Sequence, residues 1–162
     1  MEKSSMVRMR MDMLRSDEGN KKIDISTLEE KLKELGQVLK EYSPSLVAAY
    51  LFGSCANGKV GPLSDIDIAI LISNENEDCY LETKVLMDLM AILETEKVDL
   101  INLDNAPLHI QYGVLKSKKV IFSSDDLKRI DFETRVIKKY LDFKHVREMH
   151  DQIFLQRIGL EE

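Results

Sequence analysis

Hydrophobic positions recur along the chain with two periods, and these periods predict the order of its helices and strands. Apolar residues at helical spacing predict amphipathic helices over residues 26–42 and 81–93. A third helix is expected from Pro107 to about residue 116, and the chain is expected to be helical from Asp125 onward. Short apolar runs predict buried strands at 46–52, 65–72, 98–103 and 119–122. This alternation predicts an α/β fold, with a small mixed β-sheet, flanking helices and a helical C-terminal arm.

The same pattern predicts one domain with a tail. A chain of 162 residues is sized for a single core, which we expect over residues 25–124. Residues 1–24 lack a continuous apolar segment and predict a mobile N-terminal tail, with a short amphipathic helix as the alternative. Residues 125–162 are expected to form a C-terminal helical extension of the same domain. Its two apolar stripes are either core or an interface: Phe132, Val136, Tyr140, Phe143, and Val146, Met149, Ile153, Phe154.

Charge and composition remove several classes of function. The net charge of −6 argues against extended binding of nucleic acid, although it leaves room for a local nucleotide site. No apolar run approaches the roughly 20 residues that span a bilayer, so no membrane association is expected. The two cysteines, Cys55 and Cys79, fit neither a zinc pattern nor a disulfide framework. A reducing compartment, and hence a cytoplasmic location, is the prediction.

Two carboxylates interrupt the second predicted strand, where apolar side chains are expected. Burying an ionised carboxylate costs several kcal/mol unless a cation or good partners compensate it. Asp65 and Asp67 lie two residues apart, so both point to one face of the strand with β-carbons about 7 Å apart. Such a pair can chelate a hard cation such as Mg²⁺. Asp99, inside the next apolar run, is the candidate for a third ligand.

The loop before this pair has the composition of a phosphate-binding turn. Gly53 and Ser54 directly follow the first predicted strand, where backbone N–H groups and a hydroxyl can bind phosphate. Gly58 and Gly61 permit tight turning, and Lys59 is either a phosphate ligand or a solvated loop cation. Phosphate-binding groups beside metal ligands are what a metal-bound nucleoside triphosphate requires.

Structural explanations remain open for single residues of this set. Asp65 alone is explained equally well as a turn or cap residue after Ser64. Asp99 alone can be a strand-end carboxylate paired with a lysine such as Lys97. The pair Asp65 and Asp67, at a fixed distance after a Gly-Ser turn, is much harder to explain by structure alone.

At these residues the chain resembles a known family. Gly53-Ser54, ten residues and then Asp65-Ile66-Asp67 match the GS-x10-DxD signature of the DNA polymerase β-like nucleotidyltransferase superfamily. The length and strand order are similar to its minimal members, the MNT proteins, which are commonly the antitoxin partners of HEPN ribonuclease toxins. The resemblance covers roughly residues 26–143, and its specificity lies mainly in 50–71. Relatives carry loop arginines where this chain has Cys55 and Asn57.

The resemblance implies a polymerase β-like palm fold, ATP as nucleotide donor and two Mg²⁺ ions about 3.5–4 Å apart. A hydroxyl would attack the α-phosphorus of ATP and pyrophosphate would leave in line. Asp65 and Asp67 would bridge the metals, and Asp99 would hold the metal nearest the nucleophile. Gly53, Ser54 and Lys59 would contact the triphosphate.

The resulting hypothesis is a Mg-dependent nucleotidyltransferase that moves AMP from ATP to a hydroxyl of a partner protein. The resemblance implies a tyrosine of a HEPN toxin as acceptor, with this chain as the antitoxin. Two alternatives remain. A small-molecule nucleotidyltransferase needs a sizeable second domain, whereas only 37 residues follow Asp125. A catalytically silent antitoxin would neutralise its toxin by binding alone. Polymerase activity is the least favoured, and a homo-oligomer through the C-terminal helices is a further option.

Overall fold

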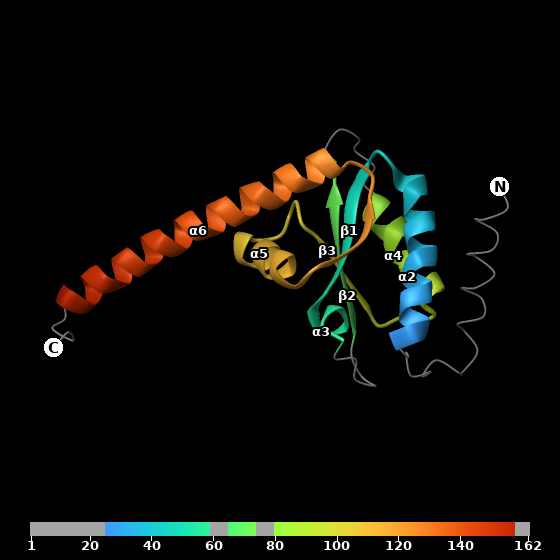
Figure 1. Cartoon of the computed structure of the whole chain (residues 1–162), viewed down its shortest axis with the longest axis horizontal. Coiled ribbons are helices and arrows are strands. Elements are labelled where there is room, and N and C mark those ends of the chain that lie inside the picture. Colours follow the sequence, from blue (N-terminus) through green and yellow to red (C-terminus); the bar gives the residue numbers. More distant parts are fainter. Residues whose placement is uncertain (1–24, 59–64, 74–79, 158–162) are drawn as a thin grey trace.

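A computed structural model describes residues 25–58, 65–73 and 80–157 of the chain (Figure 1). The predicted tail over 1–24 and the predicted phosphate ligand Lys59 lie outside the described residues, and so do Gly61 and Cys79. Within the described part, helices and strands follow one another in the predicted order. None of the helices found there is both long and apolar enough to cross a membrane.

The centre of the fold is a four-stranded mixed sheet with the order β3-β2-β1-β4. Strand β1 runs antiparallel to both of its neighbours, β2 and β4, whereas β2 and β3 are parallel. The strands are β1 (Leu46–Phe52), β2 (Ile66–Ile72), β3 (Val98–Asn102) and β4 (Lys119–Ser123). The predicted α/β class and mixed sheet are thereby confirmed, with Asp65 lying just before β2 rather than within it.

Helices cover both faces of this sheet (Figure 1). One face packs on α2 (Ile25–Leu39), which continues as a 3-10 turn over Lys40–Tyr42, and on α4 (Leu81–Leu93). The other face packs on α5 (Leu108–Ser117) and on the start of α6 (Asp126–Arg157). A further four-residue helix, α3 (Gly53–Ala56), follows β1 directly.

The alternation of side chains along β2 explains why both faces are buried. Ile66, Ile68 and Ile70 are fully buried in the cluster formed with α2 and α4. Ala69 and Leu71 point the other way, into the cluster formed with α5 and α6. Full burial of one aliphatic side chain stabilises a fold by roughly 1.5–3 kcal/mol, so this strand contributes to both halves of the core.

Helix α6 has 32 residues, and only its first part packs on the domain. Phe132 and Val136 are buried, and the ring of Tyr140 stacks on Tyr112 with centroids 3.7 Å apart. The first predicted apolar stripe of α6 therefore belongs to the core at its N-terminal end, where Phe132 and Val136 lie. Farther along the helix the described apolar side chains are exposed: Leu141, Phe143, Val146, Met149 and Ile153.

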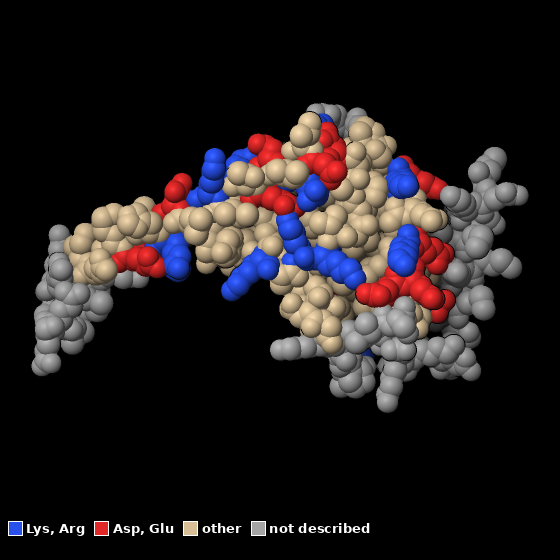
Figure 2. All heavy atoms as spheres, in the orientation of Figure 1, with Lys and Arg blue, Asp and Glu red and all other residues tan. Residues whose placement is uncertain are grey.

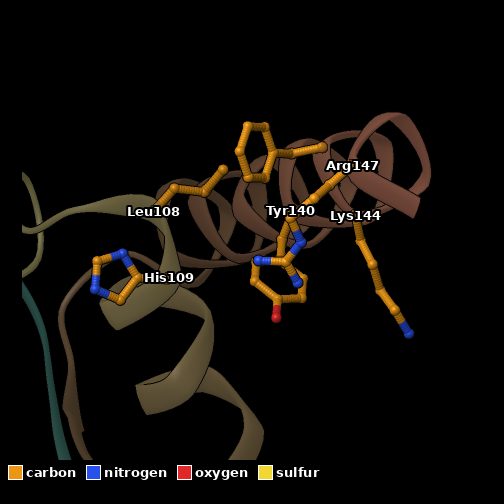
Figure 3. Close-up of a pocket in the computed structure, with 6 residues that line it drawn as sticks. Leu108, His109, Tyr140, Lys144 and Arg147 are labelled. Atoms are coloured by element: carbon orange, nitrogen blue, oxygen red, sulfur yellow. The ribbon is translucent and has the colours of Figure 1, made fainter. Parts of the chain in front are cut away.

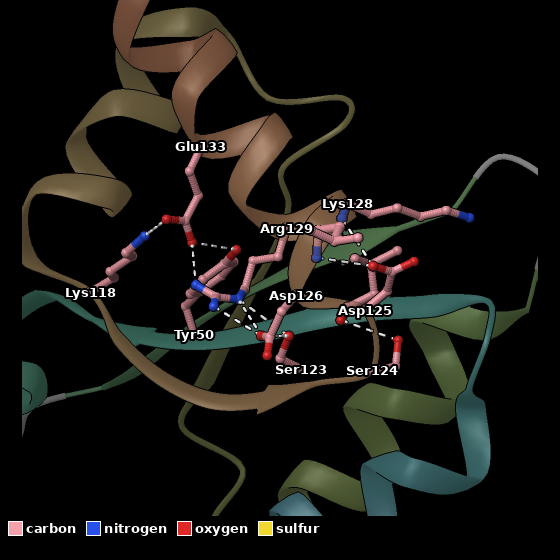
Figure 4. A network of polar contacts seen from close by, with 11 residues as sticks. Tyr50, Lys118, Ser123, Ser124, Asp125, Asp126, Lys128, Arg129 and Glu133 are labelled. Atoms are coloured by element: carbon pink, nitrogen blue, oxygen red, sulfur yellow. Dashed lines mark hydrogen bonds and ion pairs between the residues drawn. The ribbon is translucent and has the colours of Figure 1, made fainter.

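A polar network joins the start of α6 to β1 (Figure 4). The buried Tyr50 hydroxyl and the Arg129 guanidinium each donate to Glu133 Oε1 at 3.1 Å, and Lys118 forms an ion pair with Glu133. Burial alone would raise the pKa of Glu133, but Lys118 and the two donors bring it below its ordinary value. Burial, followed by the Glu133 charge, raises the pKa of Tyr50 far above its usual range. The network therefore fixes α6 against the sheet through a carboxylate.

Candidate active site

The two strand carboxylates lie side by side at one end of the sheet. Asp67 on β2 is the direct partner of Asp99 on β3 in the parallel register. Because its neighbours Ile66 and Ile68 point into the core beside α2 and α4, Asp67 points to the opposite face. Asp67 is half-buried, whereas Asp99 is exposed. The predicted placement of Asp99 beside the DxD pair on a neighbouring strand is confirmed by this register.

The surroundings of Asp67 disfavour the ionised form of its carboxyl group. Burial raises the pKa of the Asp67 carboxyl, and the nearby charges of Asp99 and Asp65 raise it further. Three carboxylates that influence one another without a compensating cation repel when ionised. A bound cation would reverse this effect, because its positive charge favours the ionised form of each carboxylate.

The turn from β1 into α3 lies directly against Asp67. Phe52, the last residue of β1, is opposite Asp67 in the antiparallel register. Gly53 then adopts φ +69°, and a Cβ added to it would overlap the Asp67 carboxylate, lying only 2.9 Å from its Cγ. Both the backbone conformation and the lack of space therefore require glycine at position 53. The predicted phosphate-binding turn and the predicted metal ligands are thus one structural unit.

The two residues that stand in place of the family's loop arginines hold this turn in position. Cys55 is buried, and its thiol contacts the backbone carbonyl of Asp65 at 3.5 Å. Burial raises the pKa of the Cys55 thiol, with a smaller lowering effect from its hydrogen bond with Ser54 and a further rise from the Asp67 charge. Asn57 is exposed and donates its side-chain amide to the carbonyl of Gly53 at 3.0 Å. Cys55 and Asn57 therefore stabilise both ends of the loop.

These roles of Cys55 and Asn57 were not predicted from the sequence. The residue type of Cys55 does not suggest a partner nearby in the chain. An Asn at the end of a helical turn can reach the carbonyl of the residue four positions earlier, and this was the only local indication for Asn57. The half-buried Ser54 directly precedes Cys55 in the short helix α3. The predicted ligand Lys59 lies outside the described residues, so it cannot be placed in the site.

The donor set suits Mg²⁺ bound together with a nucleotide. Among the residues that the structure describes, no group of three or more His, Cys, Asp or Glu side chains is arranged so that it could hold a metal ion. Mg²⁺ is usually held by one or two carboxylates together with waters and substrate phosphates, rather than by a cage built wholly from protein. Asp67 and Asp99 in register, with Asp65 close enough to raise the pKa of Asp67, fit that mode of binding.

Comparison with known proteins places the chain in a family. Residues 30–127 match the family described as Polymerase beta, Nucleotidyltransferase. The protein adenylyltransferase MntA of Aphanizomenon flos-aquae (strain 2012/KM1/D3) is 27% identical in an alignment 142 residues long, which covers 80% of this chain and 94% of the relative.

Solved structures show the same fold. A crystal structure of a toxin-antitoxin with AMP-PNP has a TM-score of 0.56 at 22% identity, over 82% of this chain and 99% of that one. A tri-AMPylated Shewanella oneidensis HEPN toxin in complex with MNT antitoxin gives the same TM-score and identity, over 78% and 98% of the two chains. With its fold, its GS-x10-DxD signature and the match over residues 30–127, this chain belongs to the polymerase beta nucleotidyltransferase family.

Proposed function

We propose that this protein transfers AMP from ATP to a tyrosine hydroxyl of a HEPN toxin and thereby acts as the antitoxin. The observation that carries the proposal is the position of Asp67, in register with Asp99 and in contact with the turn at Gly53. The name of the adenylyltransferase relative supports AMP as the transferred group. The AMPylated HEPN toxin found in complex with an MNT antitoxin supports the partner.

Asp67 and Asp99, with Asp65 nearby, would hold Mg²⁺ in this site together with the phosphates of the nucleotide. When bound, Mg²⁺ supplies positive charge that neutralises the phosphate oxygens as negative charge develops on them. The turn at Gly53 contributes backbone N–H groups that are not used within the helix, because they belong to its first turn. These groups and the Ser54 hydroxyl donate to the β- and γ-phosphates and so orient the triphosphate.

The acceptor hydroxyl attacks the α-phosphorus of ATP, and a new oxygen–phosphorus bond forms. The bond from the α-phosphorus to the oxygen that bridges to the β-phosphate breaks, and pyrophosphate leaves with that electron pair. A carboxylate oxygen of Asp99, which is exposed at the edge of the site, takes the proton of the hydroxyl. Most of the rate enhancement in such a site comes from positioning and electrostatics.

The acceptor would be supplied by the partner protein. After β4 the described part of the chain is the single helix α6. The exposed apolar side chains of α6, including Val146 and Met149, offer a face on which a partner can dock. AMP on the toxin adds a bulky group with negative charge, which would repel the phosphate backbone of an RNA substrate.

Mass spectrometry tests the proposal. The protein is incubated with its cognate HEPN toxin, ATP and Mg²⁺, and both chains are weighed. We expect an AMP adduct on the toxin with the wild type, no adduct with Asp67→Asn, and an unchanged adduct with Asp142→Asn, where an exposed carboxylate on α6 undergoes the same chemical change. A tight complex that never carries an adduct would leave only the antitoxin that acts by binding.

A further inference from the structure

A pocket of about 230 Å³ lies between the start of α5 and the middle of α6 (Figure 3). None of its lining residues belongs to the candidate active site. Asp67 and Asp99 lie at the start of β2 and β3, whereas α5 follows the end of β3. The pocket is lined by Leu108 and His109 from α5 and by Tyr140, Phe143, Lys144 and Arg147 from α6.

The size of the pocket favours side chains of a partner protein over a separate small molecule. Pockets that enclose drug-sized ligands usually measure about 300–1,000 Å³, and this one is smaller. Its walls include Leu108 and two aromatic rings, so the inserted group is apolar. One wall is rigid, because Tyr140 is stacked on Tyr112 with an interplanar angle of 4°. The Phe143 side chain is 59% exposed and is available to a docked partner.

The charge of the pocket favours an acidic partner segment. Lys144 and Arg147 line it in a chain whose net charge is −6. Lys144 has one ion pair on its own helix, with Glu148 at 3.6 Å, and both side chains are about half exposed. Exposed i,i+4 pairs of this kind contribute only about 0.3–0.5 kcal/mol, so a partner carboxylate can replace Glu148 at little cost.

A second apolar surface lies farther along α6, where Val146, Met149 and Ile153 are exposed. Since each residue turns the helix by about 100°, these three lie on another face of α6 than Tyr140, Lys144 and Arg147. In Figure 2 the far part of α6 shows a broad area that is neither acidic nor basic, with charged groups along its edges. The docking site is therefore limited to the face of α6 that carries Tyr140, Lys144 and Arg147.

We propose that this pocket is the docking site for an acidic amphipathic segment of the HEPN toxin. An aromatic or branched aliphatic side chain of that segment enters between Leu108 and Phe143, and carboxylates beside it pair with Lys144 and Arg147. The inference rests on the proposed function, because it names the surface that brings the acceptor. The packing of α6 on α5 and its polar link to β1 hold this surface at a fixed place relative to the catalytic carboxylates.

Charge reversal tests the docking site in the full-length protein. Binding of the cognate HEPN toxin is measured by titration calorimetry at low and high salt. We expect Lys144→Glu/Arg147→Glu to raise Kd about tenfold or more at low salt, with a smaller effect at high salt. Phe143→Ala should weaken binding by a similar factor at both salt concentrations, because it removes an apolar contact. Lys138→Glu/Lys139→Glu is the matched control, since both lysines are exposed on α6 and neither lines the pocket.

The outcomes separate this inference from the proposed function. ATP affinity of the free protein should be the same in all variants. If the Lys144→Glu/Arg147→Glu protein binds and modifies the toxin as well as the control variant does, the docking site is wrong and the proposed function stands. If the wild type neither binds nor modifies the toxin, the docking site and the proposed function are both wrong. If light scattering shows that the wild type self-associates and that only the pocket variants become monomeric, the occupant is a second copy and the proposal is overturned.

Discussion

Gly53 packs directly against Asp67, whose carboxylate occupies the space that a Cβ at position 53 would need. The contact arises because Gly53 follows Phe52, the residue paired with Asp67 across β1 and β2. The glycine and the second aspartate of the GS-x10-DxD signature are therefore constrained by direct contact as well as by chemistry.

Replacement of Gly53 by alanine should damage both the fold and nucleotide binding. A non-glycine residue at a left-handed backbone position costs roughly 1–2 kcal/mol, and the overlap with Asp67 adds to that cost. Gly58→Ala is a matched control, because Gly58 has the same φ of +69° but no atom within 4 Å of an added Cβ. We expect Gly53→Ala to lower the free energy of unfolding in urea more than Gly58→Ala does, and to abolish ATP binding in calorimetry. Equal losses for the two variants would show that the contact is unimportant.

Asp67→Asn should abolish transfer without weakening the fold. Because burial, Asp99 and Asp65 raise the pKa of Asp67 in the folded protein, its ionised form reduces stability. This penalty is absent below the ordinary pKa of an aspartate and complete once the pH exceeds the raised value. At pH 7 the variant should therefore melt at the same temperature as the wild type or higher, and the difference should vanish in acid. Stabilisation by Mg-ATP, measured by thermal shift, should be lost.

An unfolded Asp67→Asn protein would contradict the proposed site, because the carboxylate would then be structural. Asp142→Asn, on the exposed part of α6, should leave both the melting temperature and the Mg-ATP effect unchanged.

Ser54→Ala should weaken binding of ATP more than binding of AMP. The hydroxyl is assigned to the β- and γ-phosphates, and a hydrogen bond to a charged group is worth about 1.5–3 kcal/mol. Titration calorimetry with both nucleotides measures the difference within one variant, so AMP serves as the internal control. Equal weakening for ATP and AMP would remove Ser54 from the triphosphate pocket.

Most of the fold could be predicted from local patterns. The runs that became β1 to β4 are short and nearly continuous in apolar residues, and β1 was predicted with its observed bounds of 46–52. The placement of Asp99 on a strand beside Asp67 could be proposed because charges interrupted two such runs, whereas their direct register is a finding of the structure. These carboxylates were a strong indication of a functional site, because a carboxylate on a core strand is costly unless a specific partner compensates it.

Contacts between distant segments could not be predicted in the same way. The carboxylate of Glu133 meets Tyr50, 83 residues away, and nothing in either neighbourhood indicates the pairing. The pocket between α5 and α6 likewise combines His109 of α5 with residues of another helix. Such contacts depend on how helices pack on the sheet, which a hydrophobic period does not specify.

Glu133→Gln should destabilise the fold, because it removes the charge that Lys118 and Arg129 neutralise. The Glu133 side chain is only 14% exposed, and loss of one partner in such a network costs about 2–3 kcal/mol. Since the pKa of Glu133 lies below its ordinary value in the folded protein, its stabilising effect is present above that ordinary value. The effect is lost as the pH falls through the lowered pKa, so wild type and variant should converge in acid.

Urea unfolding of wild type and variant across this pH range measures the effect of Glu133. Asp131→Asn provides the contrast, because it breaks the exposed pair with Arg135, in which the side chains are 73% and 57% exposed. Screening by solvent limits such a pair to about 0.5 kcal/mol. Hydrogen exchange should also quicken in the first turns of α6 in the Glu133→Gln variant, since Tyr50 and Lys118 no longer hold that end of the helix through a carboxylate. Equal, small losses in both variants would show that apolar packing of Phe132 and Val136 alone fixes α6 on the sheet.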